Sequence, residues 1–141
     1  QHPIKTKGKI MFNKDSIAKL ILRLSLGFLI LFHGVAKVID PSSIEFFGNR
    51  LAEFSLPSLL AYGVYIGELV APLMLIIGFY TRTAAFLITV NMVFAIMLFH
   101  IHHLIELNQY GGWELELQGF YFLTAIIIFL QGSGKYAVRP S

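Results

Sequence analysis

The sequence contains no cysteine among its 141 residues. Disulfides, thiolate metal centres and a cysteine-based redox relay within this chain are therefore excluded. Charged residues are also scarce, because Asp, Glu, Lys and Arg make up only 13% of the chain, against about 25% in a typical soluble domain. The chain has too little charge to cover a surface that faces water on all sides.

Apolar residues take the place of the missing charge and make up 56% of the chain. They form four stretches close to the roughly 20 residues that cross the apolar layer of a bilayer. These stretches cover residues 17–39, 57–79, 83–102 and 115–131. A single domain of this size could not bury four helices that are apolar on all sides. We therefore predict an all-α membrane protein, a four-transmembrane-helix antiparallel bundle.

Positive charge gathers at both ends of the chain. Five lysines lie within residues 5–19, and Lys135 and Arg139 lie near the C-terminus, whereas the connections after the first and third spans carry carboxylates. Positively charged flanks stay in the cytoplasm, so we expect both termini to be cytoplasmic. Topology thus accounts for the net charge of +3. Membrane lipids are the expected surroundings, and nucleic acid is not an expected partner.

The membrane domain is expected to cover residues 16–136. We expect residues 1–15 to form a cytoplasmic N-terminal extension, of which the part before Met11 is foreign to the native protein. Residues 137–141 would form a short cytoplasmic tail.

A short amphipathic helix is predicted between the first two spans. Ile44, Phe47, Leu51 and Phe54 recur there at helical spacing, with charged residues between them. Such a helix either lies on the outer membrane surface or packs over the bundle.

Polar side chains inside the apolar stretches are the only lead to function, because hydrocarbon does not tolerate an ionised group without a partner. With a helical rise of about 1.5 Å per residue, Glu68 lies near mid-membrane and level with Asn91. We expect Arg23 to pair with Glu68, because its long stem can cover the offset in depth. Such a pair would either fix the helix register or belong to a binding or proton-handling site.

Further polar groups are expected near the outer side. His33 and Lys37 lie one helical turn apart on the first span, and Lys37 is expected to reach the lipid headgroups. His100 and Gln118 lie at a depth similar to that of His33. These groups predict a polar funnel that leads from the outer surface towards mid-membrane. The ligand-binding candidates read from the residues are Arg23, His33, Lys37, Glu68, Asn91, His100 and Gln118.

The sequence does not identify the ligand. His100 and His103, three residues apart, could point the same way and hold a metal ion. His33 and His100 could instead lie on either side of a haem or a quinone headgroup. The sequence shows no phosphate-binding loop, nucleophile elbow or cofactor fingerprint, so no catalytic residue is assigned.

Several short motifs follow one another in a fixed order. They are Leu22-Arg23-Leu24 with Gly27, His33-Gly34 with Lys37, Gly67-Glu68, Gly78-Phe79-Tyr80-Thr81-Arg82, Gly111-Gly112-Trp113-Glu114 and Gly132-Ser133-Gly134-Lys135-Tyr136. On these motifs the sequence resembles the DoxX family of small integral membrane proteins, over about residues 17–136. The resemblance implies an inner-membrane protein linked to quinone-dependent oxidoreductase assemblies. The candidate site residues that it implies are Arg23, His33, Lys37, Glu68, His100 and Glu114.

Two functions therefore remain in view. The first is a membrane subunit that binds a quinone or a similar amphiphile at the polar cluster and works with a redox partner protein or a second copy. The second is a non-catalytic scaffold or assembly factor whose buried Arg–Glu pair is structural. A solute or proton carrier is less favoured, because the four spans show no evident inverted repeat.

Overall fold

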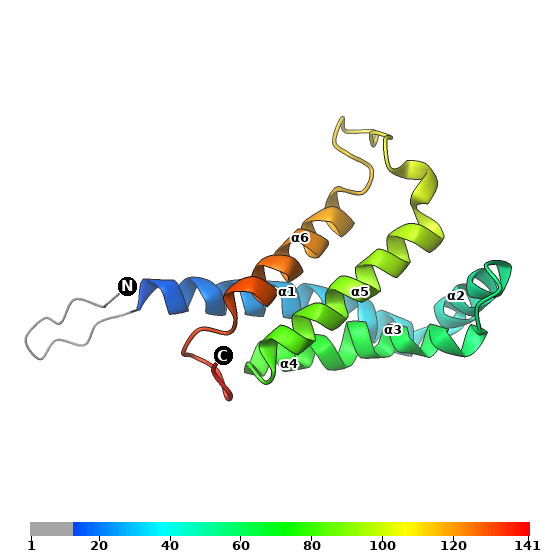
Figure 1. Ribbon diagram of the computed structural model, residues 1–141. Helices are drawn as coiled ribbons and strands as arrows, with labels where there is room; N and C mark the ends of the chain where they lie inside the picture. Colours follow the sequence, from blue (N-terminus) through cyan, green and yellow to red (C-terminus); the bar gives the residue numbers. More distant parts are fainter. Residues whose placement is uncertain (1–12) are drawn as a thin grey trace, which may run out of the picture.

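The computed structural model describes residues 13–141 and shows helices joined by connections, of which the longest is residues 104–115 before α6 (Figure 1). The predicted Met11 boundary and most of the predicted extension 1–15 lie outside the described residues. The elements in chain order are α1 (Lys14–Ile39), α2 (Ser42–Glu53), η1 (Ser58–Tyr62), α3 (Gly63–Tyr65), η2 (Ile66–Val70), α4 (Ala71–Ile77), α5 (Thr81–Phe99), η3 (Ile101–His103) and α6 (Glu116–Gln131).

Three helices in the described part of the chain are long and apolar enough to cross a membrane. They are Lys14–Ile39, Ser58–Ile77 and Thr81–Phe99. The second of them, here called the second apolar helix, is continuous from η1 through α4. α6 is apolar as predicted, but its 16 residues fall short of the roughly 20 that span a bilayer at right angles.

The four apolar helices pack around one core. α1 packs against α4 and α6, and α5 packs against the same two helices. The buried core residues are Leu26, Ile30, Ala71, Leu75, Ala84, Ala85, Ile88, Met92, Tyr121, Ala125 and Ile128. Gly34 on α1 allows the closest approach, because a Cβ there would overlap the backbone carbonyl of Glu68. A glycine at this position therefore brings α1 directly against the residue that carries the buried carboxylate.

α2 packs over one end of this bundle, which decides between the two predicted positions. Ile44 and Leu51 are buried against Ala61, Val64 and Leu98. In addition, Nε of Arg50 donates a 2.6 Å hydrogen bond to the carbonyl of Leu98 near the end of α5. The bundle thus buries Ile44 and Leu51 of α2, whereas Phe46 and Phe54 stay exposed.

The opposite end of the bundle holds both ends of the described chain (Figure 1). The amide of Lys135 donates to Oγ of Ser16 at the start of α1. The amides of Val138 and Arg139 donate to the carbonyls of Ile77 and Gly78 at the turn after α4. The short tail predicted at 137–141 thus packs against the bundle, because two of its amides bond to carbonyls left unpaired at a helix end. Residues 132–141 are called the C-terminal segment below.

Candidate functional site

Arg23 on α1 is buried, with 1% of its surface exposed, and it donates to main-chain carbonyls. Its Nε lies 3.0 Å from the carbonyl oxygen of Leu75. Its Nη1 lies 2.9 Å from that of Ser133 and 2.8 Å from that of Tyr136. The predicted pairing of Arg23 with Glu68 is therefore wrong. The guanidinium instead satisfies carbonyls at the C-terminal end of α4 and in the C-terminal segment, where a helix favours positive charge.

Glu68 is paired with Lys37 instead. Nζ of Lys37 on α1 lies 2.6 Å from Oε1 of Glu68, and Nδ2 of Asn91 on α5 donates to Oε2 at 2.9 Å. Glu68 is buried, with 6% of its surface exposed. The prediction that Lys37 reaches the headgroups is wrong, because a buried carboxylate in a medium of low dielectric attracts the ammonium more strongly than the interface does. One carboxylate thus joins three helices.

The backbone around Glu68 is unusual. The amide of Ala71 donates to the carbonyl of Ile66, which makes η2 a π-helical turn. Pro72 follows, and it has no N–H with which to bond the carbonyl of Glu68 as an α-helix would require. π-helical turns are frequent at functional sites. The turn places Glu68 on the side of the helix that faces Lys37 and Asn91.

A cavity of about 190 Å³ lies beside Glu68 and is called the polar cavity below. Its lining residues are Ile30, His33, Lys37, Glu68, Met92, Ala95, Phe99, His100, Leu117, Gln118 and Tyr121. Five of the residues named from the sequence thus meet in one place, although they come from α1, η2, the residue that follows α5, and α6. Asn91 contacts the cavity only through its bond to Glu68. Arg23 lies outside it, at the other end of the bundle, and Glu114 is exposed in the loop before α6.

Four polar side chains of the polar cavity have no hydrogen-bond partner among residues 13–141. They are His33, His100, Gln118 and Tyr121. The rings of His33 and Tyr121 meet edge to face, with their centroids 6.0 Å apart. Both ring nitrogens of each histidine, the amide and the phenol remain available to a ligand. The cavity therefore combines one internally neutralised ion pair with four further hydrogen-bonding groups and a wall that includes the aromatic rings of Phe99 and Tyr121.

The second histidine of the proposed metal pair has another partner. Nδ1 of His103 lies 2.6 Å from Oε1 of Glu106. This hydrogen bond raises the pKa of the exposed His103 imidazole above its usual value, and the nearby charges of Glu106 and Glu114 add to the effect. The ring centroids of His100 and His103 are 6.3 Å apart. Within residues 13–141 no group of three or more His, Cys, Asp or Glu side chains could hold a metal ion, so the geometry gives this pair no third ligand.

These observations define a multi-pass helical membrane protein with a polar cavity among its apolar helices. The chain belongs to the DoxX family, whose profile matches residues 18–101. A Haemophilus influenzae protein named "Uncharacterized protein" is 33% identical over 121 residues, which cover 83% of this chain and 84% of that protein. A Bacillus subtilis protein named "Putative oxidoreductase CatD" is 28% identical over 125 residues, covering 88% of this chain and 86% of that protein. No solved structure gives a significant match.

Proposed function

We propose that this protein is an inner-membrane subunit of a quinone-linked oxidoreductase system, and that the polar cavity holds the quinone ring. The observation that carries the proposal is a buried, ion-paired carboxylate facing a cavity whose other polar side chains form no hydrogen bond within residues 13–141. A relative named as an oxidoreductase adds support. Ionisable groups inside membrane-spanning segments are costly, and they mark binding and proton pathways more often than they serve packing alone.

The size and lining of the polar cavity fit a single ring. Its volume of about 190 Å³ is below the roughly 300–1,000 Å³ of most small-molecule sites. Phe99 and Tyr121 supply the aromatic wall, and His33 and His100 can each donate one N–H to a ring carbonyl. The apolar tail of a membrane quinone would then lie outside the polar cavity, in contact with lipid.

The Lys37–Glu68 pair would handle protons. Reduction of a quinone to a quinol takes up two electrons and two protons. Glu68 would relay protons, and Lys37, as its ion-pair partner, would set the charge state of Glu68. The electrons would come from a redox partner protein, since this chain has no cysteine and no cofactor fingerprint in its sequence.

Changing Glu68 to Gln tests this assignment. Glu68→Gln keeps the shape and one acceptor but removes the charge that holds Lys37 and the proton. We expect the affinity of the reconstituted protein for a decyl-tailed benzoquinone to fall by about tenfold or more, which corresponds to about 1.4 kcal/mol. Fluorescence quenching of Trp113 or equilibrium dialysis would measure it. Glu53→Gln is the matched control, because Glu53 is also ion-paired but lies outside the polar cavity. Unchanged affinity in correctly folded Glu68→Gln would overturn the proposal.

We propose four spans with both termini cytoplasmic. The start of α1, the turn after α4 and the C-terminal segment lie at one end of the bundle, which is the arrangement that an even number of crossings requires. Because the chain has no cysteine, single-cysteine labelling is clean. In intact spheroplasts, Gln109→Cys should react with a membrane-impermeant maleimide, whereas Lys135→Cys should react only after permeabilisation. Equal reactivity of the two variants would contradict this topology.

The second candidate function is that of a scaffold or assembly factor. Its structural ion pair would be Lys37 with Glu68 rather than Arg23 with Glu68. The observation in its favour is that both carboxylate oxygens of Glu68 are satisfied by other helices. Such a carboxylate could serve only to fix how α1 and α5 pack against η2. A double substitution that separates the two functions is argued in the Discussion.

A further inference from the structure

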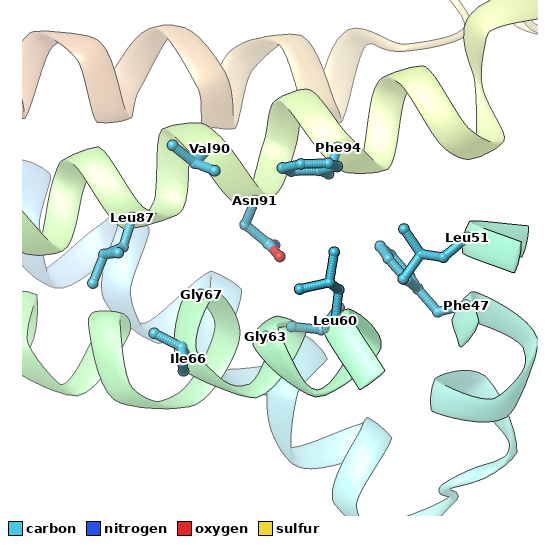
Figure 2. A pocket seen from close by; sticks show the side chains of 11 residues that line it. Phe47, Leu51, Leu60, Gly63, Ile66, Gly67, Leu87, Val90, Asn91 and Phe94 are labelled. Atoms are coloured by element: carbon cyan, nitrogen blue, oxygen red, sulfur yellow. The ribbon is translucent and has the colours of Figure 1, made fainter. Parts of the chain in front are cut away.

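A second cavity lies between the second apolar helix and α5, beneath α2 (Figure 2). We call it the lateral groove, and its volume is about 240 Å³. Its lining residues are Phe47, Leu51, Leu60, Gly63, Val64, Ile66, Gly67, Leu87, Val90, Asn91 and Phe94. The groove shares no lining residue with the polar cavity. The close contact between Gly67 and Asn91 lies between the two, since a Cβ on Gly67 would come within 2.6 Å of Cβ of Asn91.

Gly63 in the wall of the lateral groove has no local reason to be glycine. Its backbone is helical, with φ −61° and ψ −22°, which every residue adopts. A Cβ at this position would meet no atom within 4 Å. Glycine is about 1 kcal/mol less favourable than alanine inside a helix. Gly63 therefore makes no close helix contact, and the missing side chain leaves space at the wall of the groove.

Asn91 is the one polar side chain in the lining of the lateral groove (Figure 2). Its Nδ2 is held by Glu68, and a carboxylate only accepts hydrogen bonds, so the orientation of the amide is fixed. Oδ1 of Asn91 therefore faces away from Glu68, and no donor among the described residues reaches it. An acceptor in an apolar groove stays unfavourable until a donor arrives.

The lateral groove opens to the bilayer. Four of its lining residues are partly exposed on the outside of the bundle, namely Leu60 (51%), Ile66 (49%), Val90 (36%) and Phe94 (43%). In a chain whose helices cross the membrane, the neighbouring medium at this depth is aliphatic chains. The end beneath α2 is covered by Phe47 and Leu51.

We propose that the lateral groove binds an aliphatic chain that carries a hydroxyl group, and that this hydroxyl donates a hydrogen bond to Oδ1 of Asn91. The chain lies over Gly63, in the space that any larger side chain would fill. The site is separate from the polar cavity, so its failure would leave the function proposed above untouched.

Photolabelling in a bilayer tests this site against ordinary lipid contact. The purified protein is placed in phosphatidylcholine nanodiscs with a long-chain alcohol that carries a diazirine on its chain, and labelled residues are mapped by mass spectrometry. We expect the alcohol to label the segment around Gly63 and Val90 several-fold more than Leu73 and Phe86, which are exposed apolar residues outside the groove. The methyl ether of the same alcohol lacks the donor and should show a clearly smaller excess.

Variants of the lateral groove complete the test. Gly63→Leu adds bulk where a Cβ would meet no atom within 4 Å, and Val90→Phe adds bulk on the opposite helix. Both should reduce labelling to the level of the outside residues. Leu73→Phe adds bulk on the lipid-facing side of α4 and should retain the labelling excess. Uniform labelling of all lipid-facing residues, or an excess that persists in folded Gly63→Leu and Val90→Phe, would overturn the site. Equal labelling by the alcohol and its ether would overturn the role of Asn91.

Discussion

Replacing Arg23 by Met should cause one of the largest losses of stability that a single substitution in this chain can produce. The guanidinium is 1% exposed and bonds the carbonyls of Leu75, Ser133 and Tyr136. Hydrogen bonds to a charged group contribute about 1.5–3 kcal/mol each, and unpaired buried carbonyls add a penalty. We therefore expect the free energy of unfolding to fall by about 3 kcal/mol or more. Reversible unfolding in mixed detergent micelles would measure it.

The same substitution should release the C-terminal segment. Trypsin should cleave after Lys135 faster in Arg23→Met than in the wild type, because the carbonyls that hold this segment lose their donor. Arg23→Lys should fall between the two, since one ammonium cannot reach acceptors that a planar guanidinium spans. Lys135→Met, an exposed change in the same segment, is the stability control. Wild-type stability in Arg23→Met would show that these hydrogen bonds are not what holds the segment.

Much of the architecture was accessible from the sequence, because long apolar runs leave the backbone few alternatives to a helix in lipid. The same reasoning identified the polar residues that meet in the polar cavity, since any ionisable group at that depth needs a partner. α2 was predicted from the spacing of its apolar residues. Its position required the structure, because an amphipathic face can be covered equally by lipid headgroups or by Ala61, Val64 and Leu98.

The partner of Glu68 was not accessible by the same route. Depth along a helix compares heights, but it does not say which way two side chains face around their axes. Arg23 was a suitable partner by its depth in the membrane. Its acceptors, however, include main-chain carbonyls 110 and 113 positions further along the chain, and every residue has such a carbonyl, so the sequence does not indicate which ones Arg23 contacts. Lys37 lies one helical turn from His33 on the same face of α1. This shared face was the signal in the sequence that Lys37 could lie beside the other polar residues. Lys37 reaches Glu68 because α1 packs closely against η2 at Gly34. This contact between helices was not predicted from the sequence.

The second large effect concerns Lys37. Replacing Lys37 by Met should leave the carboxylate of Glu68 buried with only Asn91 as partner. Removing one member of a buried ion pair costs about 3–5 kcal/mol, so we expect Lys37→Met to unfold in detergent far more readily than the wild type. Glu68→Gln alone should cost less, because an amide carries no charge and can still bond Asn91. The double variant Lys37→Met with Glu68→Gln should regain most of the loss, since no buried charge remains.

This double variant also separates the two proposed functions. If the polar cavity binds a quinone, the variant should be as stable as the wild type to within about 1 kcal/mol and yet bind the decyl-tailed benzoquinone poorly, because the groups that hold the proton are gone. If the ion pair is only structural, recovery of stability should restore every property of the protein, including co-purification of partner proteins from its native membrane. Recovered stability with unchanged quinone affinity would therefore remove the quinone assignment and leave the scaffold. A double variant that stays as unstable as Lys37→Met would show instead that the ion pair is net stabilising, unlike most buried ion pairs. The packing of α1 against η2 would then depend on the charges of Lys37 and Glu68.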